Sequence, residues 1–82
     1  MKYYLIEIAT YVDGTKDSCG IYTYNTLSEA VATFHSKMGG AMKNANYATE
    51  LLKVIDGDGN EYRVEKWVRP IEEVAEPVTD NE

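Results

Sequence analysis

Two hydrophobic periods alternate along this chain, one typical of β-strands and one typical of an α-helix. Residues 2–11 are rich in β-formers and alternate between two faces of an extended segment. One face would carry Tyr4, Ile6 and Ile8, and the other Tyr3, Leu5, Glu7 and Ala9. Because both faces are partly apolar, we expect an interior strand here. A polar stretch from Asp13-Gly14 to Ser18 predicts a hairpin loop, and a second strand follows at residues 20–24.

The helical period begins directly after this second strand. Thr26 and Glu29 form a capping box, in which each side chain satisfies a backbone donor of the other residue. The apolar positions that follow share an arc of roughly 120° on a helical wheel, and they are Leu27, Ala30, Val31, Phe34, Met38, Ala41, Met42 and Ala45. This arc is expected to lie on a sheet, and Asn44 or Asn46 to end the helix.

Two further strands complete the pattern, at residues 47–55 and 61–68. The segment 56–60 between them, Asp-Gly-Asp-Gly-Asn, has the composition of a tight hairpin turn, because these residues accept a positive φ. The order ββαββ predicts an α+β fold, a four-stranded antiparallel sheet with one amphipathic helix packed on one face.

The charge of the chain divides it into a body and a tail. The net charge is −6, but residues 70–82 hold five acids and no bases, whereas residues 1–69 hold nine acids and all eight bases. We therefore expect a single domain over residues 1–69 and a flexible acidic tail over residues 70–82, with a short helical turn at Ile71 and Val74 as the alternative. The near-neutral body shows no basic face, so a nucleic-acid partner is not expected.

Size and cysteine usage point to self-association. A chain of 82 residues buries a thin core. Cys19 and His35 are the single cysteine and the single histidine, so neither an intrachain disulfide nor a structural zinc site can support the fold. Small domains without such staples often gain stability by association. A homo-oligomer, most simply a dimer, is expected.

The candidate catalytic and ligand-binding motifs fail on inspection. The run Asp56-x-Asp58-x-Asn60 matches the first ligand positions of a calcium loop, but Glu61 stands where glycine is required and Trp67 where a glutamate is required. Cys19 and His35 have no identifiable orienting partner. The carboxylates are scattered, and no glycine-rich loop precedes the helix. The sequence therefore predicts no enzyme, no metal and no cofactor.

The pair Gly39-Gly40 is unexpected in a helix interior, where two glycines cost about 2 kcal/mol relative to alanine. They fall on the back of the helix, in a strip of small residues with Ala32 and Ser36. Three interpretations stay open. The strip docks a partner closely, or the glycines simply bend the helix, or they break it near Met38 and free backbone donors that, with Lys37 and Lys43, hold an anion.

A four-stranded sheet with one helix leaves one face uncovered, and the chain is rich in aromatic residues. We expect some of Tyr3, Tyr22, Tyr24, Tyr62 and Trp67 to lie on this open face as a dimer or ligand surface. The alternative is that the tyrosines pack flat across the sheet with their hydroxyls in water. The predicted partner-binding residues are Ala32, Ser36, Gly39, Gly40, Lys43, Tyr22, Tyr24 and Trp67.

The stretch from Tyr22 to Ala45, and above all its segment His-Ser-Lys-Met-Gly-Gly-Ala-Met-Lys-Asn-Ala at residues 35–45, resembles small uncharacterised proteins of phages and prophages of gut-type Gram-positive bacteria. The resemblance covers roughly residues 2–68. It implies a phage context and carries over no functional residue. The start of the chain lacks the features of a signal peptide, and no apolar run reaches the ~18 residues of a membrane span, so the bacterial cytoplasm is the expected location.

These observations lead to a functional hypothesis. The chain is expected to be a non-enzymatic phage-type binding module that occupies a protein or a small ligand, with a host-defence antagonist as the narrower role. The alternative is a structural or assembly component of a phage particle.

Overall fold

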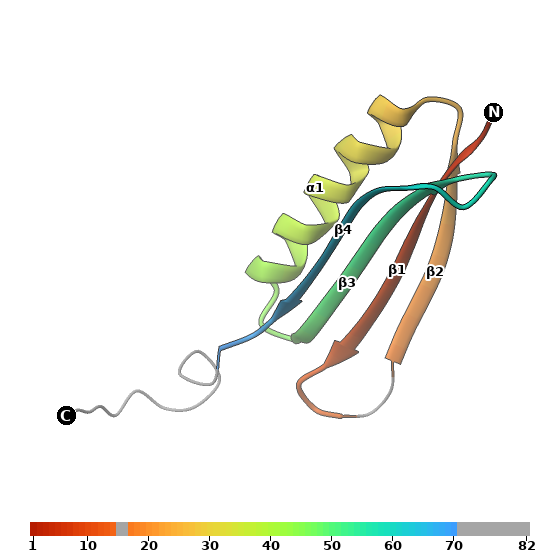
Figure 1. The fold of residues 1–82 in the computed structure, drawn as a ribbon. Helices are drawn as coiled ribbons and strands as arrows, with labels where there is room; N and C mark the ends of the chain where they lie inside the picture. The colour runs from red at the N-terminus through yellow and green to blue at the C-terminus, as the bar shows by residue number, and fades with distance from the viewer. Residues whose placement is uncertain (15–16, 71–82) are drawn as a thin grey trace.

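The protein folds as one helix on one four-stranded sheet (Figure 1), in a computed structural model that describes residues 1–14 and 17–70. The elements are β1 (Tyr3–Tyr11), β2 (Asp17–Tyr24), α1 (Leu27–Lys43), β3 (Tyr47–Asp56) and β4 (Glu61–Val68). The strand order is β2-β1-β3-β4, and every neighbouring pair is antiparallel. The predicted ββαββ order, the sheet and the single helix are confirmed, and β1 is an interior strand as expected.

The two hairpin connections, between β1 and β2 and between β3 and β4, follow the local chemistry of the chain. Gly14 after β1 and Gly59 before β4 take φ values of 71° and 88°, in the left-handed region that side chains disfavour. Each donates its N–H back to the end of the preceding strand, Gly14 to Tyr11 O at 3.0 Å and Gly59 to Asp56 O at 3.0 Å. The hairpin at residues 56–60 is therefore confirmed. The other predicted loop lies partly outside the described residues, at positions 15 and 16.

Both ends of α1 are capped by identifiable groups. Thr26 Oγ1 accepts the N–H of Glu29 at 3.2 Å, which confirms the predicted cap at the start. At the other end the N–H of Asn44 donates to Ala41 O at 3.2 Å. The side chain of Arg69, one residue beyond β4, adds donors to Tyr47 O at 2.7 Å and to Asn44 O at 2.7 Å. These hydrogen bonds connect the C-terminal end of α1 to the residue that follows β4, an edge strand of the sheet.

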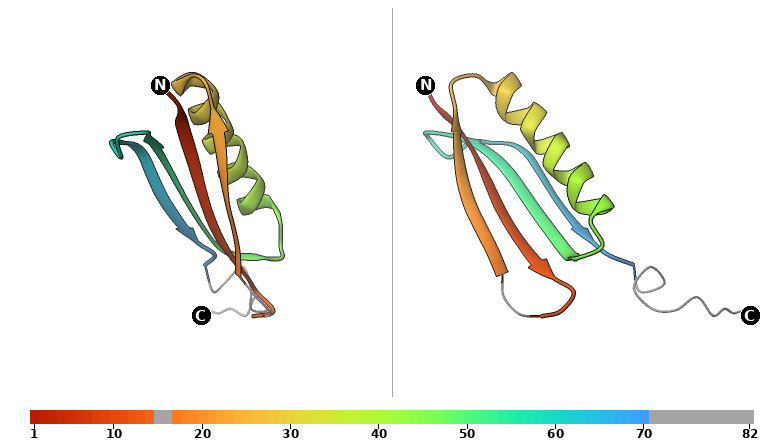
Figure 2. Two further views of the ribbon diagram at one scale, coloured as in Figure 1. Left: turned by 90° about the vertical axis from the view of Figure 1, so that its right-hand side faces the viewer. Right: turned by 180° about the vertical axis from the view of Figure 1, so that it is seen from behind.

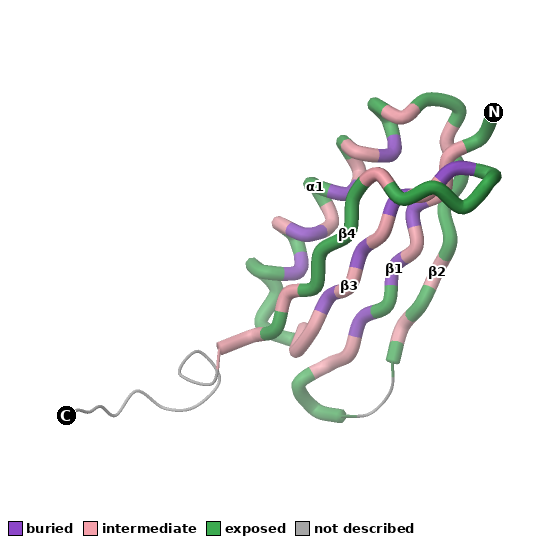
Figure 3. The backbone as a smooth tube through the Cα atoms, viewed as in Figure 1, coloured by how far each residue is buried: buried purple, intermediate pink, exposed green. Residues whose placement is uncertain are grey.

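The core lies between α1 and the sheet (Figure 3). Its buried members come from β1, α1 and β3, and they are Leu5, Ala30, Phe34, Met38, Leu52 and Val54. Larger, partly buried side chains pack around them, and they are Tyr3, Tyr24, Leu27, Tyr62 and Trp67. The core is therefore a single layer with aromatic flanks.

The expectation that these aromatic residues occupy the open face is wrong. Tyr3, Tyr24, Tyr62 and Trp67 pack against the core, and Tyr22 extends toward Glu7 on the same face. The physical reason is a mismatch of widths. An α-helix is about 10–12 Å across, whereas four strands span about 19 Å. Bulky side chains on the helix side fill the space that α1 leaves beside it.

The helix runs without a break through Gly39 and Gly40 (Figure 1). The hypothesis of a broken helix with freed donors near Met38 is therefore wrong. A Cβ atom built on either glycine meets no described atom within 4 Å. Packing among residues 1–14 and 17–70 therefore does not require a glycine at either position.

The predicted acidic tail and its possible helical turn fall at residues 71–82, outside the described residues. Within residues 1–14 and 17–70, no helix combines the length and apolar character that a bilayer crossing demands.

Candidate functional site

Figure 2 shows α1 on one face of the sheet, and the opposite face is here called the open face. Cross-strand partners in an antiparallel sheet lie on the same face, so the pairing register defines its members in rows. From β2 to β4 the rows are Thr23, Tyr4, Ile55 and Glu61; then Ile21, Ile6, Lys53 and Val64; then Cys19, Ile8, Leu51 and Lys66; and last Asp17, Thr10, Thr49 and Val68.

The open face is aliphatic and exposed. Ile21 is 69% exposed, Val68 57%, Val64 55% and Ile8 41%. On the two interior strands, β1 and β3, it carries Ile6, Ile8, Leu51 and Ile55, with Lys53 between the last two. Three of its four corners are polar, at Asp17, Thr23 and Glu61. A mainly apolar surface with polar residues at its corners is typical of a protein–protein interface.

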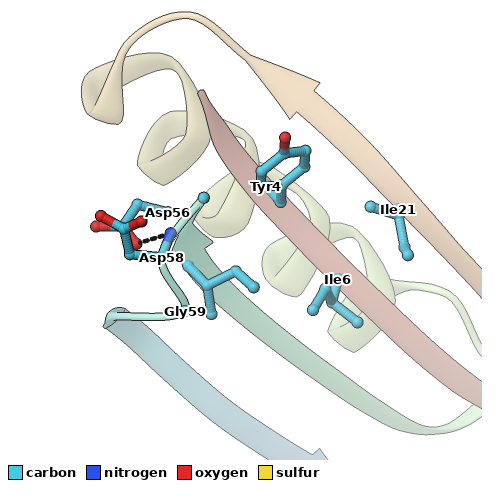
Figure 4. Close-up of a pocket in the computed structure, with 8 residues that line it drawn as sticks. Tyr4, Ile6, Ile21, Asp56, Asp58 and Gly59 are labelled. Atoms are coloured by element: carbon cyan, nitrogen blue, oxygen red, sulfur yellow. Dashed lines mark hydrogen bonds between the residues drawn. The ribbon is translucent and has the colours of Figure 1, made fainter. Parts of the chain in front are cut away.

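The open face contains two adjoining hollows. The first, of about 570 Å³, is lined by Tyr4, Ile6, Ile21, Ile55 and the turn from Asp56 to Gly59 (Figure 4). The second, of about 510 Å³, is lined by residues 6–8 and 19–21. Because Ile6 and Ile21 border both hollows, the two hollows form one shallow depression along β1 and β2. Apolar side chains of a partner would fit into it.

The turn beside the first hollow is held by Asp56. Its Oδ1 accepts the N–H groups of Asp58 at 2.8 Å and Asn60 at 3.0 Å, and its Oδ2 accepts Asn60 Nδ2 at 3.0 Å and the Tyr62 hydroxyl at 2.7 Å. The hydrogen bonds from Asn60 and then Tyr62 lower the pKa of Asp56 to about 2. The Asp56 carboxylate therefore stabilises the hairpin turn through these four hydrogen bonds.

No group of three or more histidine, cysteine, aspartate or glutamate side chains is placed to hold a metal ion in the described part of the chain. The exposed Cys19 is a free thiol on the open face. His35, its hypothetical catalytic partner, lies on α1 with its ring against Phe34, on the other side of the sheet. The structure therefore does not bring Cys19 and His35 together.

A second feature, between α1 and the sheet, is a buried pair of acids. Glu7 of β1 is 9% exposed and Glu50 of β3 is completely buried. Neither oxygen of Glu50 has a hydrogen-bond partner in the described structure. Glu7 pairs with Leu52 and Ala9 pairs with Glu50, so the two acids are diagonal neighbours on the helix side of the sheet. Two buried carboxyl groups in contact cannot both ionise without a large cost. Burial, then the hydrogen bond to Glu7 and its charge, raise the pKa of Glu50 to about 8.

Glu7 is the ionised member of the pair. Lys37 Nζ lies 3.3 Å from Glu7 Oε1, and the Tyr22 hydroxyl donates to the same oxygen at 3.3 Å. Burial by itself would raise the pKa of Glu7, but hydrogen bonds from Glu50, Lys37 and Tyr22 outweigh it and lower that pKa. Burial also opposes the charge of Lys37, yet its hydrogen bond with Glu7 leaves the pKa of Lys37 raised. The lowered pKa of Glu7 and the raised pKa of Glu50 leave Glu7 ionised and Glu50 protonated at neutral pH.

The position of Tyr22 depends on Gly20. Both residues point to the helix side of β2, and the Lys37 ammonium lies 4.4 Å from the centre of the Tyr22 ring. A Cβ on Gly20 would stand 3.1 Å from the Tyr22 hydroxyl oxygen and 3.3 Å from the ring carbon that bears it. Without a side chain, Gly20 leaves the space through which Tyr22 reaches Glu7.

The predicted partner-binding residues fall on different surfaces. Ala32, Ser36, Gly40 and Lys43 are exposed on α1, and Gly39 beside them is half-buried. Tyr22, Tyr24 and Trp67 lie instead on the helix side of the sheet, and the Arg69 guanidinium stacks 4.7 Å from the centre of the Trp67 ring. The strip along α1 is thus a surface of its own, separate from the three aromatic residues.

Sequence reasoning missed the acid pair and the aliphatic character of the open face. Glu7 carried one usable signal, because it occupies an inward position between Leu5 and Ala9 in the alternation of β1. Its contact with Glu50 depends on the pairing of β1 with β3, which no local pattern encodes.

No protein-family model, curated protein or solved structure matches this chain.

Proposed function

We propose that this protein is a non-enzymatic binding module that works as a homodimer, with the open face of one copy packed on the open face of another. The observation that carries the proposal is the exposed aliphatic surface centred on Ile6 and Ile21. Contiguous apolar patches larger than about 300–600 Å² are rare on soluble monomers and mark interaction sites.

The size of the open face suits a second copy. Four strands about 4.8 Å apart and about eight residues long at 3.3 Å per residue give a footprint of roughly 500 Å². Two interlocking faces bury somewhat more than their footprint, so the total would be about 1,000–1,400 Å², near the lower limit of about 1,200 Å² for stable interfaces. Packed sheets stand about 10 Å apart, a spacing that isoleucine and valine side chains from both copies fill.

The chemistry of the open face also suits a copy of itself. Its centre is aliphatic, and the Lys53 ammonium is paired within the same chain to Glu61 Oε2 at 2.9 Å. Packing this face on another copy therefore buries its isoleucine, leucine and valine side chains without an unpaired charge at Lys53, and Lys66 lies at the β4 edge of the face. Such a dimer supplies the second core layer that a chain of this length lacks.

Sheet-to-sheet packing leaves both α1 helices on the outside of the dimer. The strip of Ala32, Ser36 and Gly40 stays accessible there for a further partner. In the phage context that the resemblance implies, the narrower role is a host-defence antagonist that acts by binding, and the alternative is a structural or assembly component of a phage particle.

The test is the mass of the protein in solution, measured by sedimentation over a concentration series. We expect the wild type to dimerise at micromolar concentration. Ile21→Lys should shift the protein to monomer while the fold is kept, because the Ile21 side chain is already 69% exposed. Met42→Lys is the matched control, since Met42 is an exposed apolar residue on α1 at 42%, and it should dimerise like the wild type.

A wild type that stays monomeric at high micromolar concentration contradicts the proposal. So does an Ile21→Lys variant that dimerises as tightly as the wild type. Circular dichroism of each variant separates a loss of association from a loss of folding.

A further inference from the structure

The buried pair of Glu7 and Glu50 has no part in the proposed dimer, because it lies on the opposite side of the sheet. Glu50 is completely buried, so it cannot contact a substrate in this conformation. Neither of its oxygens has a hydrogen-bond partner in the described structure. Its raised pKa means that it carries a proton at neutral pH. A buried group of this kind affects the protein through its state of protonation.

We propose that Glu7 and Glu50 form a proton-operated clamp, in which one shared proton keeps the C-terminal half of α1 on the sheet and its loss releases that half. This inference stands independently of the proposed dimer.

The position of the pair beneath α1 explains which part would move. The chain leaves β2 at Tyr24, which pairs with Tyr3, so α1 starts at that end of the sheet and finishes near the opposite end. Glu50 pairs with Ala9 at that opposite end. Lys37 links α1 directly to Glu7, and the buried Met38 and Ala41 belong to the same half of the helix.

Loss of the proton leaves two negative charges in the core with one nearby ammonium group, that of Lys37. The negative end of the helix dipole lies on this side as well, and it disfavours a second anion. A buried ionised carboxylate without donors is strongly disfavoured, and opening of the helix end would let water reach Glu50. Opening the helix end also breaks the hydrogen bonds from Arg69, so the closed state persists while Glu50 is protonated.

The titratable and charged groups around the pair come from every element that packs on it, and they are Glu7 and Tyr11 of β1, Tyr22 of β2, Lys37 of α1, Tyr47 of β3, Glu65 of β4 and Arg69 after it. Burial and then Tyr11 raise the pKa of Tyr47 above its ordinary value of 10.0. The pKa of Lys37 lies above 10.5, and that of Glu7 lies below 4.5. At neutral pH these directions leave Glu7 ionised, and Lys37 and Tyr47 protonated.

The pKa of Glu50 in the closed and the open states decides whether a rise in pH favours opening of the C-terminal half of α1. It is about 8 in the closed protein, against an ordinary value of 4.5 when the helix end is open. Between these values only the closed state binds the proton, so the opening equilibrium rises by up to about tenfold for each pH unit. Above about pH 8 the proton is lost in both states, and the equilibrium becomes constant.

The experiment is amide hydrogen exchange by NMR on the full chain at pH 5.5 and pH 7.5, corrected for intrinsic exchange rates. We expect protection at residues 37–43 to fall at least tenfold between these values in the wild type. Glu50→Gln should remove most of this change, because its amide donates to Glu7 at every pH. Glu65→Gln is the control, an exposed acid in the same cross-strand row as Glu7, and it should behave as the wild type.

Equal protection at both pH values in the wild type would overturn the clamp. The same pH dependence in Glu50→Gln would overturn it too, as would a loss of protection in β1 and β3 that matches that of α1. If Glu50→Gln does not fold, the carboxyl carbon-13 shift of Glu50 in the wild type decides. Titration near pH 8 supports the clamp, and titration near pH 4.5 contradicts it.

Discussion

The guanidinium of Arg69 donates a hydrogen bond of 2.7 Å to the carbonyl oxygen of Asn44, the residue that ends α1. A second bond from Arg69 Nε reaches Tyr47 O at 2.7 Å. The last residues of a helix leave carbonyl groups without partners, and a cation there also favours the helix dipole. One side chain thus joins the helix end, the start of β3 and the end of β4.

Replacing this side chain should loosen the helix end. We expect Arg69→Ala to lower the free energy of unfolding by about 1–3 kcal/mol, because several carbonyl groups lose a charged donor. Urea denaturation measures the change. Lys43→Ala, which removes an exposed basic residue from the last turn of α1, should cost less than half as much. Equal effects of the two substitutions would show that only general charge near the helix end matters.

Two glycines with different surroundings should respond in opposite ways to alanine. Gly40→Ala meets no described atom within 4 Å and replaces a poor helix former, so we expect it to stabilise the protein by up to about 1 kcal/mol. Gly20→Ala should destabilise it by about 1 kcal/mol, because the new Cβ would press on the Tyr22 hydroxyl. Thermal unfolding of both variants is the measurement. A destabilised Gly40→Ala would mean that the helix requires a glycine there for its own path.

The turn at Asp56 should make part of the stability depend on acid. The pKa of Asp56 is about 2 in the folded protein, against an ordinary value of 3.8. The contribution of ionised Asp56 to the free energy of unfolding is therefore fully present above about pH 4, and it is lost as the pH falls toward 2. We expect Asp56→Asn to be less stable than the wild type at pH 6, and the difference to shrink at pH 2.5. A constant difference across this range would show that ionisation of Asp56 is irrelevant to the turn.

The elements of the fold could be predicted because each carries a local signal. The capping box at Thr26, the glycine-rich turn before β4 and the alternation of β1 all act within a few residues. The strand order could not be predicted, since the pairing of β1 with β3 joins segments that are distant in sequence. The contact of Glu7 with Glu50 depends on that pairing and was missed for the same reason.

The error over the aromatic residues has a different cause. The number of tyrosines suggested an excess that one helix could not cover, but the register decides the face. Tyr22 pairs with the buried Leu5, and Trp67 with the buried Glu50, so both must lie on the helix side. The aliphatic residues of the opposite parity, such as Ile6 and Ile21, then form the open face.

In the proposed dimer, the open face of one copy covers the open face of another. Isotope-filtered nuclear Overhauser effects, recorded on an equal mixture of carbon-13-labelled and unlabelled protein, detect contacts between copies. We expect such contacts at the methyl groups of Ile6, Ile8, Ile21 and Leu51, and none at Ala32. The absence of contacts between copies at millimolar concentration, or contacts confined to α1, would contradict the proposed dimer.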